Sequence, residues 1–194
     1  TLEEAAEYTA RGFDTLKVKI GDCLETDIER LARLHEVYGE RVKVRVDVNR
    51  GYTPAEYDEF LRRTAPFGLE FIEQPLGADA VDVMRSMPAA ARRLTAADES
   101  LLRPADALAL SRPPQPFGIF NIKLMKCGGI SQGLQIADIA HLADIELMWG
   151  CMDESVISIA AALHAALASP ATRYLDLDGS LDLARDVAAG GFHL

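Results

Sequence analysis

The sequence lacks long apolar runs, closely spaced cysteines and an excess of basic residues. No run approaches the roughly 18 apolar residues of a membrane-spanning helix, so we expect no membrane partner. Three cysteines (Cys23, Cys127 and Cys151) are an odd number without close spacing, which predicts neither a disulfide framework nor a zinc knuckle. The formal net charge of −10 argues against nucleic-acid binding, which needs a basic face. No signal-like segment opens the sequence, and we expect a reducing cytoplasm.

The sequence instead alternates apolar strand-like runs with amphipathic helical segments. Hydrophobic residues make up 49% of its 194 residues, which is enough for a sizeable core in one large domain. The alternation predicts seven strands with helices between them and hence an α/β fold with a parallel sheet. A closed (β/α) TIM-type barrel has eight strands. We therefore expect an incomplete barrel of about seven βα units, with residues 1–194 as its catalytic domain.

Local signals place several of these elements. Thr53-Pro54 predicts the start of a helix, because proline is favoured at the first helical position. The segment 79–93 reads as one helix, and the segment 117–124 reads as one strand.

Charged residues recur where the apolar runs end. From Asp47 to Glu73, Asp98 and Lys123 the intervals are 26, 25 and 25 residues, the length of one strand, one helix and two loops. Active sites of such barrels lie at the C-terminal ends of the strands. Buried charges are costly unless they meet each other, a metal or a substrate, so the pattern indicates an enzyme. The full set is Lys17, Lys19, Asp47, Glu73, Asp98, Lys123, Glu154, Asp176 and Asp178.

Three lysines are candidates for acid–base chemistry. Lys17 and Lys19 are two residues apart in a strand, so both point to the same face. Burial and a neighbouring cation lower the pKa of a lysine and make it a usable base. The alternative is an edge strand whose lysines face solvent. Lys123 ends a later strand, whereas we expect a surface position for Lys126 in the loop before Gly128-Gly129, a pair suited to positive φ.

Three carboxylates, Asp47, Glu73 and Asp98, end successive strands and predict a Mg²⁺ site. Converging carboxylates repel unless a cation neutralises them, and hard oxygen ligands suit Mg²⁺. No sulfur or histidine accompanies them, which disfavours zinc. The alternative is that each carboxylate caps the helix that follows it. Asn49 is either a partner behind the metal ligands or a turn residue.

Asp176 and Asp178 share a face of the last strand by their period-two spacing. Two carboxylates at the mouth of a barrel suggest capture of a cationic group such as an ammonium. For Asp178 the alternative is an Asx-type turn before Gly179.

Five short motifs now lie in order along the chain, and they are Lys17-Val18-Lys19, Asp47-Val48-Asn49, Ile72-Glu73-Gln74-Pro75, Ala97-Asp98-Glu99-Ser100 and Asn121 to Gly129. Together they resemble the enolase superfamily, its muconate-lactonising subgroup and, within that, dipeptide epimerases of the Ala-Glu type. The resemblance covers essentially the whole chain. Lys or His bases with Mg²⁺ are a known feature of that superfamily.

The resemblance implies an isomerase that inverts one centre of a dipeptide through an enediolate. Asp47, Glu73 and Asp98 would bind Mg²⁺, and Lys19 and Lys123 would transfer the proton on opposite faces of the substrate carbon. Further roles are implied by the same resemblance. Lys17 would lower the pKa of Lys19 and stabilise the anion. The pair Asp176 and Asp178 would hold the substrate ammonium, and Glu154 would have a supporting role in the same site.

The resemblance also implies that parts of the family architecture lie outside this sequence. These are an α+β capping domain, the first barrel strand and the last C-terminal portion. Two alternatives share the site: an o-succinylbenzoate synthase-like dehydratase and a muconate-type cycloisomerase. A third is a non-catalytic barrel fragment. Members of the family often associate through their barrel helices, so assembly as a homo-oligomer is a further alternative.

Overall fold

The computed structural model describes residues 2–181 and 183–191. The chain divides into two compact units, Thr1–Thr95 and Ala96–Leu194, and each is described by itself. Among the described residues there are seven strands, and their order in the sheet follows the chain from β1 to β7. The predicted α/β fold of the TIM-barrel type is therefore confirmed. No helix in this part of the chain has the length and apolarity needed to cross a bilayer.

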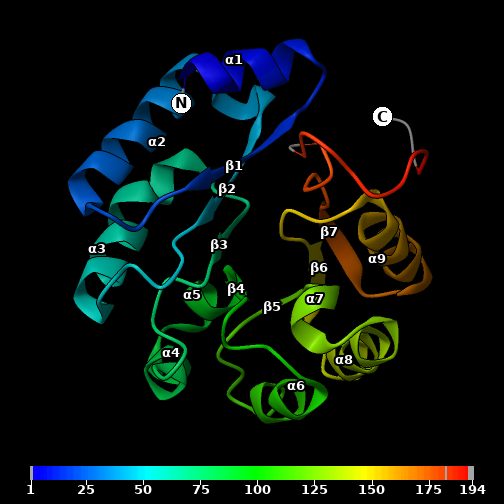
Figure 1. Ribbon diagram of the computed structural model, residues 1–194. Helices are drawn as coiled ribbons and strands as arrows, with labels where there is room; N and C mark the ends of the chain where they lie inside the picture. The colour runs from blue at the N-terminus through cyan, green and yellow to red at the C-terminus, as the bar shows by residue number, and fades with distance from the viewer. Residues whose placement is uncertain (1, 182, 192–194) are drawn as a thin grey trace. The chain divides into compact units, whose positions relative to one another are not determined.

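The first unit is built from βα repeats whose strands pair in parallel. Lys19 pairs in register with Asp47, and Asp47 pairs with Glu73, so the ends of three strands are level. Figure 1 shows the long helices α2 and α3 (blue to teal) on one side of these strands. The elements are α1 (Leu2–Ala10), β1 (Thr15–Lys19), α2 (Leu24–Tyr38), η1 (Gly39–Arg41), β2 (Lys43–Asp47), α3 (Pro54–Thr64), η2 (Ala65–Phe67), β3 (Phe71–Glu73), α4 (Val81–Ser86) and α5 (Ala89–Arg93).

The second unit continues the same pattern with parallel pairs from β4 to β7. Strand β4 spans the division between the units, and Gly150 at the end of β6 pairs with Asp176 at the end of β7. The elements are β4 (Thr95–Ala97), α6 (Pro104–Leu110), β5 (Ile119–Ile122), α7 (Leu124–Cys127), α8 (Ile130–Leu142), β6 (Glu146–Gly150), α9 (Val156–Ala168) and β7 (Thr172–Asp176).

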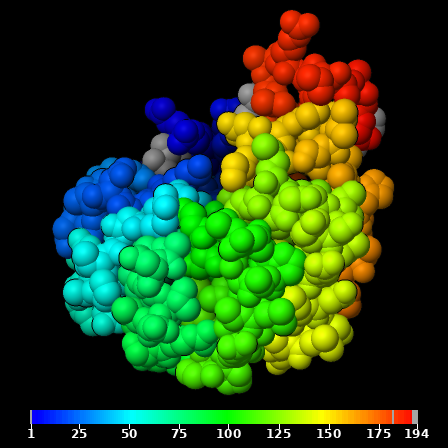
Figure 2. Space-filling model, turned by 60° about the horizontal axis from the view of Figure 1, so that its bottom comes forward, coloured from blue at the N-terminus to red at the C-terminus, as the bar shows by residue number. Residues whose placement is uncertain are grey.

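The segment after β7 is fastened to the start of α9. The Asp186 carboxylate accepts hydrogen bonds from the Ser155 hydroxyl at 2.6 Å and the Val156 amide at 2.7 Å. It therefore caps the Val156 amide, one of the groups that the first turn of a helix leaves without an intrahelical partner. Figure 2 shows this C-terminal segment (red) beside the chain that leads into α9.

Two predicted boundaries were wrong, and both have local causes. The single helix expected over 79–93 is two helices, α4 and α5, because Pro88 forces Met87 out of the helical region (φ −65°, ψ 155°). The strand expected over 117–124 ends at Ile122, and the short helix α7 begins at Leu124. Lys123 therefore lies between a strand and a helix and is not part of the strand.

The start of α3 offers a direct stability test. The Thr53 hydroxyl accepts from the Glu56 amide, the Glu56 carboxylate accepts from the Thr53 amide at 2.8 Å, and Pro54 follows at the first position. We expect Thr53→Ala to lower the free energy of unfolding by about 1 kcal/mol, the usual contribution of such a cap. Thr53→Ser keeps the hydroxyl and is expected to stay close to wild type in urea denaturation. Equal losses in both variants would contradict a capping role.

Candidate active site

The first unit gathers one lysine and two carboxylates at the ends of adjacent strands. The Lys17 ammonium lies 2.9 Å from Glu73 Oε2 and 3.5 Å from Asp47 Oδ2. The Glu73 side chain is 0% exposed, that of Asp47 is 3% exposed, and that of Lys17 is 17% exposed. Two buried carboxylates at paired positions repel each other, and the cation between them offsets that repulsion.

Lys19 lies on the same side of β1 as Lys17, as the spacing predicted. Leu16 and Val18, which alternate with the two lysines, are buried, whereas Lys17 is half-buried and Lys19 is exposed. The backbone of Lys19 is held from α2, because Arg30 Nη1 donates to the Lys19 carbonyl at 2.9 Å. Lys19 is thus an accessible amine on a fixed strand end, in register with Asp47.

The turns that follow β2 and β3 have unusual backbone geometry. Asn49, Arg50 and Gln74 have φ of 46°, 67° and 35°, values that L residues adopt rarely. The Asn49 amide donates to Asp47 Oδ1 at 3.1 Å, and the Arg50 amide donates to the Gln74 carbonyl at 2.8 Å. Asn49 is thus a turn residue whose backbone amide contacts the Asp47 carboxylate, and its role behind a metal ligand stays a prediction. Backbone of this kind often marks functional sites.

In the second unit, Asp98 is the centre of a second cluster. Lys123 Nζ donates to Asp98 Oδ2 at 2.7 Å, and Lys126 forms a close ion pair with Asp98 Oδ1. Lys126 also donates to the carbonyl groups of Asp98 at 2.8 Å and Asn121 at 3.1 Å. The surface position expected for Lys126 is wrong, because its side chain is only 7% exposed. Lys126 lies in helix α7, three residues beyond Lys123, and the four residues of this helix are too few to show a helical period in the sequence.

The charge balance of this cluster keeps Asp98 ionised. Burial raises the pKa of Asp98, but the Lys126 and Lys123 cations outweigh burial and hold the pKa at about 2. Because the folded pKa lies below its ordinary value of 3.8, the stabilisation is complete above pH 3.8 and is lost as pH falls toward 2.

We expect Asp98→Asn to remove this pH dependence. At pH 5 the wild type should exceed the variant in free energy of unfolding by about 2 kcal/mol or more, and the gap should shrink between pH 4 and pH 2. Urea denaturation at pH 5, 4 and 3 measures the gap. If the difference in free energy of unfolding stays constant over this range, the two lysines do not lower the pKa of Asp98.

A third group of acidic residues lies near Cys151, after β6 and at the end of β7. The last strand ends at Asp176, so the expectation that Asp176 and Asp178 share a face of that strand is wrong, and Asp178 lies in the segment that follows it. The Cys151 thiol donates to the Asp176 carbonyl at 3.2 Å and lies 3.7 Å from Asp178 Oδ1. Burial, with added effects from Asp178, Asp176 and Glu154, raises the pKa of Cys151 to about 12. Glu154 is buried, and its carboxylate accepts from the Met152 amide at 2.9 Å and from the Ser158 hydroxyl. The structure thus brings the three acidic residues together around one protonated thiol.

Within residues 2–181 and 183–191, no three histidine, cysteine, aspartate or glutamate side chains are grouped closely enough to hold a metal ion. The donor chemistry nevertheless fits Mg²⁺, because Asp47, Glu73 and Asp98 are buried hard oxygen donors and each contacts a lysine ammonium. Positive charge is stabilised at all three positions.

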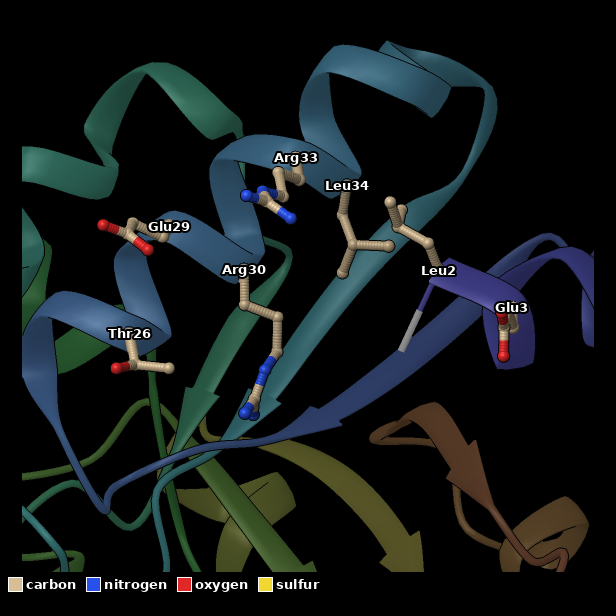
Figure 3. Close-up of a pocket in the computed structure, with 7 residues that line it drawn as sticks. All are labelled: Leu2, Glu3, Thr26, Glu29, Arg30, Arg33 and Leu34. Carbon is tan, nitrogen blue, oxygen red and sulfur yellow. The ribbon is translucent and has the colours of Figure 1, made fainter.

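One pocket of the first unit lies away from these residues. It measures about 420 Å³ and is lined by α1 and α2, with Thr26, Glu29, Arg33 and Leu34 on α2. Figure 3 shows Arg30, another lining residue, reaching from α2 toward the strands. The pocket is therefore formed by residues of α1 and α2, and none of the candidate site residues lines it.

Parallel βα units with lysines and carboxylates at the carboxyl ends of their strands define a protein of the (β/α)-barrel class. A family model described as "Enolase C-terminal domain-like" matches residues 1–194. The chain belongs to that family.

Individual relatives agree with this assignment. An L-Lys-D/L-Arg epimerase of Methylococcus capsulatus is 61% identical over 194 residues, which are 100% of this chain and 54% of that protein. A crystal structure of the dipeptide epimerase from Methylococcus capsulatus, complexed with Mg and the dipeptide L-Arg-D-Lys, superposes with a TM-score of 0.97 at 61% identity and covers 100% of this chain and 55% of that one. An L-Ala-D/L-Glu epimerase of Bacillus subtilis is 36% identical over 191 residues, which are 97% of this chain and 52% of that protein. The chain spans about half the length of these relatives.

Proposed function

We propose that this chain forms the barrel part of a Mg²⁺-dependent dipeptide epimerase, with Lys- and Arg-containing dipeptides as substrates. The observation that carries the proposal is the Lys17 ammonium between the Asp47 and Glu73 carboxylates at the ends of adjacent parallel strands. The substrate class is taken from the name of a relative that is 61% identical. Location in the cytoplasm and assembly as a homo-oligomer remain predictions.

Asp47, Glu73 and Asp98 are the residues proposed to hold Mg²⁺. When bound, the metal supplies positive charge beside the substrate carboxylate and so makes the α-proton more acidic. The fit is supported by the lysine contacts of all three carboxylates, because a group that holds an ammonium closely is also suited to a metal cation. Asn49 is proposed to orient Asp47 through its backbone amide.

Lys19 and Lys123 are proposed to transfer the proton from opposite faces of the α-carbon. The lysine that begins neutral takes the α-proton and becomes an ammonium. The other begins as an ammonium, returns a proton to the opposite face and becomes neutral, so charge and protons balance. Lys17 adds a fixed positive charge that stabilises the substrate anion between these steps.

The acidic group around Cys151 is proposed to hold the substrate ammonium. Asp176 and Asp178 supply the carboxylates, and Glu154 stabilises the loop before α9 through the Met152 amide. Burial is the main cause of the raised pKa of Cys151, but Asp178, Asp176 and Glu154 each raise this pKa further, and the negative charge that they place here also favours a bound cation.

Proton exchange in D₂O tests the proposal. The chain is incubated with Mg²⁺ and either L-Lys-L-Arg or L-Lys-D-Arg, and NMR follows the α-proton of the arginine. We expect loss of that signal, with deuterium incorporation, only when Mg²⁺ is present and only on one residue of the dipeptide. If no dipeptide exchanges under any metal condition, this chain by itself is not an epimerase and the non-catalytic alternative is favoured.

A further inference from the structure

Asp27, on the first turn of α2, is a buried carboxylate that the proposed mechanism does not use. Asp27 is 2% exposed. Its Oδ2 accepts from the Gly21 amide at 2.8 Å and from the Tyr52 hydroxyl at 2.9 Å, and its Oδ1 lies 3.9 Å from Arg30 Nη1. These contacts come from the turn after β1, the turn after β2, and α2 itself. The carboxylate thus joins three segments that converge on the end of β1.

The segments around Asp27 leave almost no room to move. A Cβ atom on Gly21 would lie 2.3 Å from the Val48 carbonyl oxygen, and one on Gly51 would lie 2.1 Å from the Gly21 carbonyl oxygen. Gly21 also has φ of 115°, which L side chains rarely adopt. The backbone turns that follow Lys19 and Asp47 are therefore pressed together, and Asp27 holds the Gly21 amide in this arrangement.

The same helix holds the backbone of Lys19. Arg30 is one turn beyond Asp27 on α2, and its Nη1 donates to the Lys19 carbonyl at 2.9 Å. Two peptide groups, the carbonyl of Lys19 and the amide of Gly21, are thus fixed by two neighbouring side chains of α2. Figure 3 shows the Arg30 side chain directed from the helix toward the strands.

We propose that Asp27 and Arg30 are positioning residues for Lys19, and this inference rests on the proposed epimerase function. Neither residue contacts the substrate in this scheme. They set the direction in which the exposed Lys19 side chain leaves the strand end. Proton transfer is sensitive to such placement, since a displacement of about 1 Å can cost on the order of 10²-fold in rate.

The two-lysine scheme provides a readout that a general structural role would not change. Lys19 and Lys123 each exchange the α-proton of one epimer, and the epimer that Lys123→Met still exchanges is assigned to Lys19. In Asp27→Asn and Arg30→Met we expect the exchange rate of that epimer to fall by about 10–100-fold. Exchange of the other epimer is expected to stay within about three-fold of wild type. Glu29→Gln, an exposed change on the same helix, is the matched control.

Equal losses for both epimers would overturn the inference, because they would indicate damage to the fold as a whole. Tyr52→Phe keeps Asp27 in place and removes one of its hydrogen bonds, so it provides a milder variant if Asp27→Asn does not fold. In Tyr52→Phe the exchange rate of the epimer assigned to Lys19 should fall, but by less than in Asp27→Asn. A fall in the exchange rates of both epimers would again overturn the inference.

A second measurement does not depend on activity. Amide hydrogen exchange of the wild type and Asp27→Asn compares Gly21 with Val46 in the middle of β2. Faster exchange at Gly21 with Val46 unchanged supports local positioning, and faster exchange at both sites overturns it. If the wild type exchanges no dipeptide proton, the proposed function fails, while the amide measurement still decides whether Asp27 fixes the end of β1.

Discussion

Replacement of either Lys19 or Lys123 by methionine is expected to stop epimerisation but to leave proton exchange of one epimer in each variant. Each lysine serves a single face of the α-carbon, so a chain with one lysine removes and returns the proton on the same face. The net change of configuration should fall by about 10²–10⁴-fold, the usual contribution of a general acid or base. The lost exchange should belong to opposite epimers in the two variants.

Polarimetry or circular dichroism follows the inversion, and NMR in D₂O follows the exchange. Lys43→Met is a suitable control, because this lysine lies at the amino end of β2 and its side chain is 64% exposed. The same epimer losing exchange in both variants would be incompatible with bases on opposite faces. Such a result would favour a one-base reaction, as in the dehydratase alternative.

The positions of the strands could be predicted from the sequence because apolar runs and charged ends recur at nearly constant intervals. Period-two spacing correctly placed Lys17 and Lys19 on one side of β1, and Leu16 and Val18, which alternate with them, are buried. The recurring interval also put Asp47 and Glu73 at the ends of adjacent strands, where they pair in register. These features depend on the spacing within one strand or on the interval between successive strands, so they can be predicted without knowledge of distant contacts.

Features that depend on side chains reaching across turns could not be predicted in this way. The burial of Lys126 requires helix α7, whose four residues are too few to show a helical period. The network around Asp27 joins residues 25 positions apart through Tyr52 and depends on two glycines in close contact. Nothing in the spacing of these residues distinguishes them from ordinary helix and loop positions.

Glu73→Gln is expected to remove most of the rise in melting temperature that Mg²⁺ produces. A ligand at 100 times its Kd stabilises the folded state by about 2.7 kcal/mol, and loss of a ligand carboxylate should remove most of this. Without Mg²⁺ the variant should also be less stable than wild type, because Lys17 loses the carboxylate that lies 2.9 Å away, and the Asp47 carboxylate is farther, at 3.5 Å. Removing one partner of a buried ion pair costs about 3–5 kcal/mol.

Lys17→Met separates the two effects, because it removes the cation that competes for the same oxygens. In that variant the melting temperature without Mg²⁺ should fall, since two buried carboxylates face each other, while the rise caused by Mg²⁺ should become larger than in wild type. Glu36→Gln, an exposed change on α2, should behave as wild type. Thermal unfolding with MgCl₂ and with NaCl of equal ionic strength measures all four proteins. If Mg²⁺ stabilises Glu73→Gln as strongly as wild type, or if NaCl gives the same rise, then Glu73 is not a metal ligand and its partner in the folded protein is Lys17.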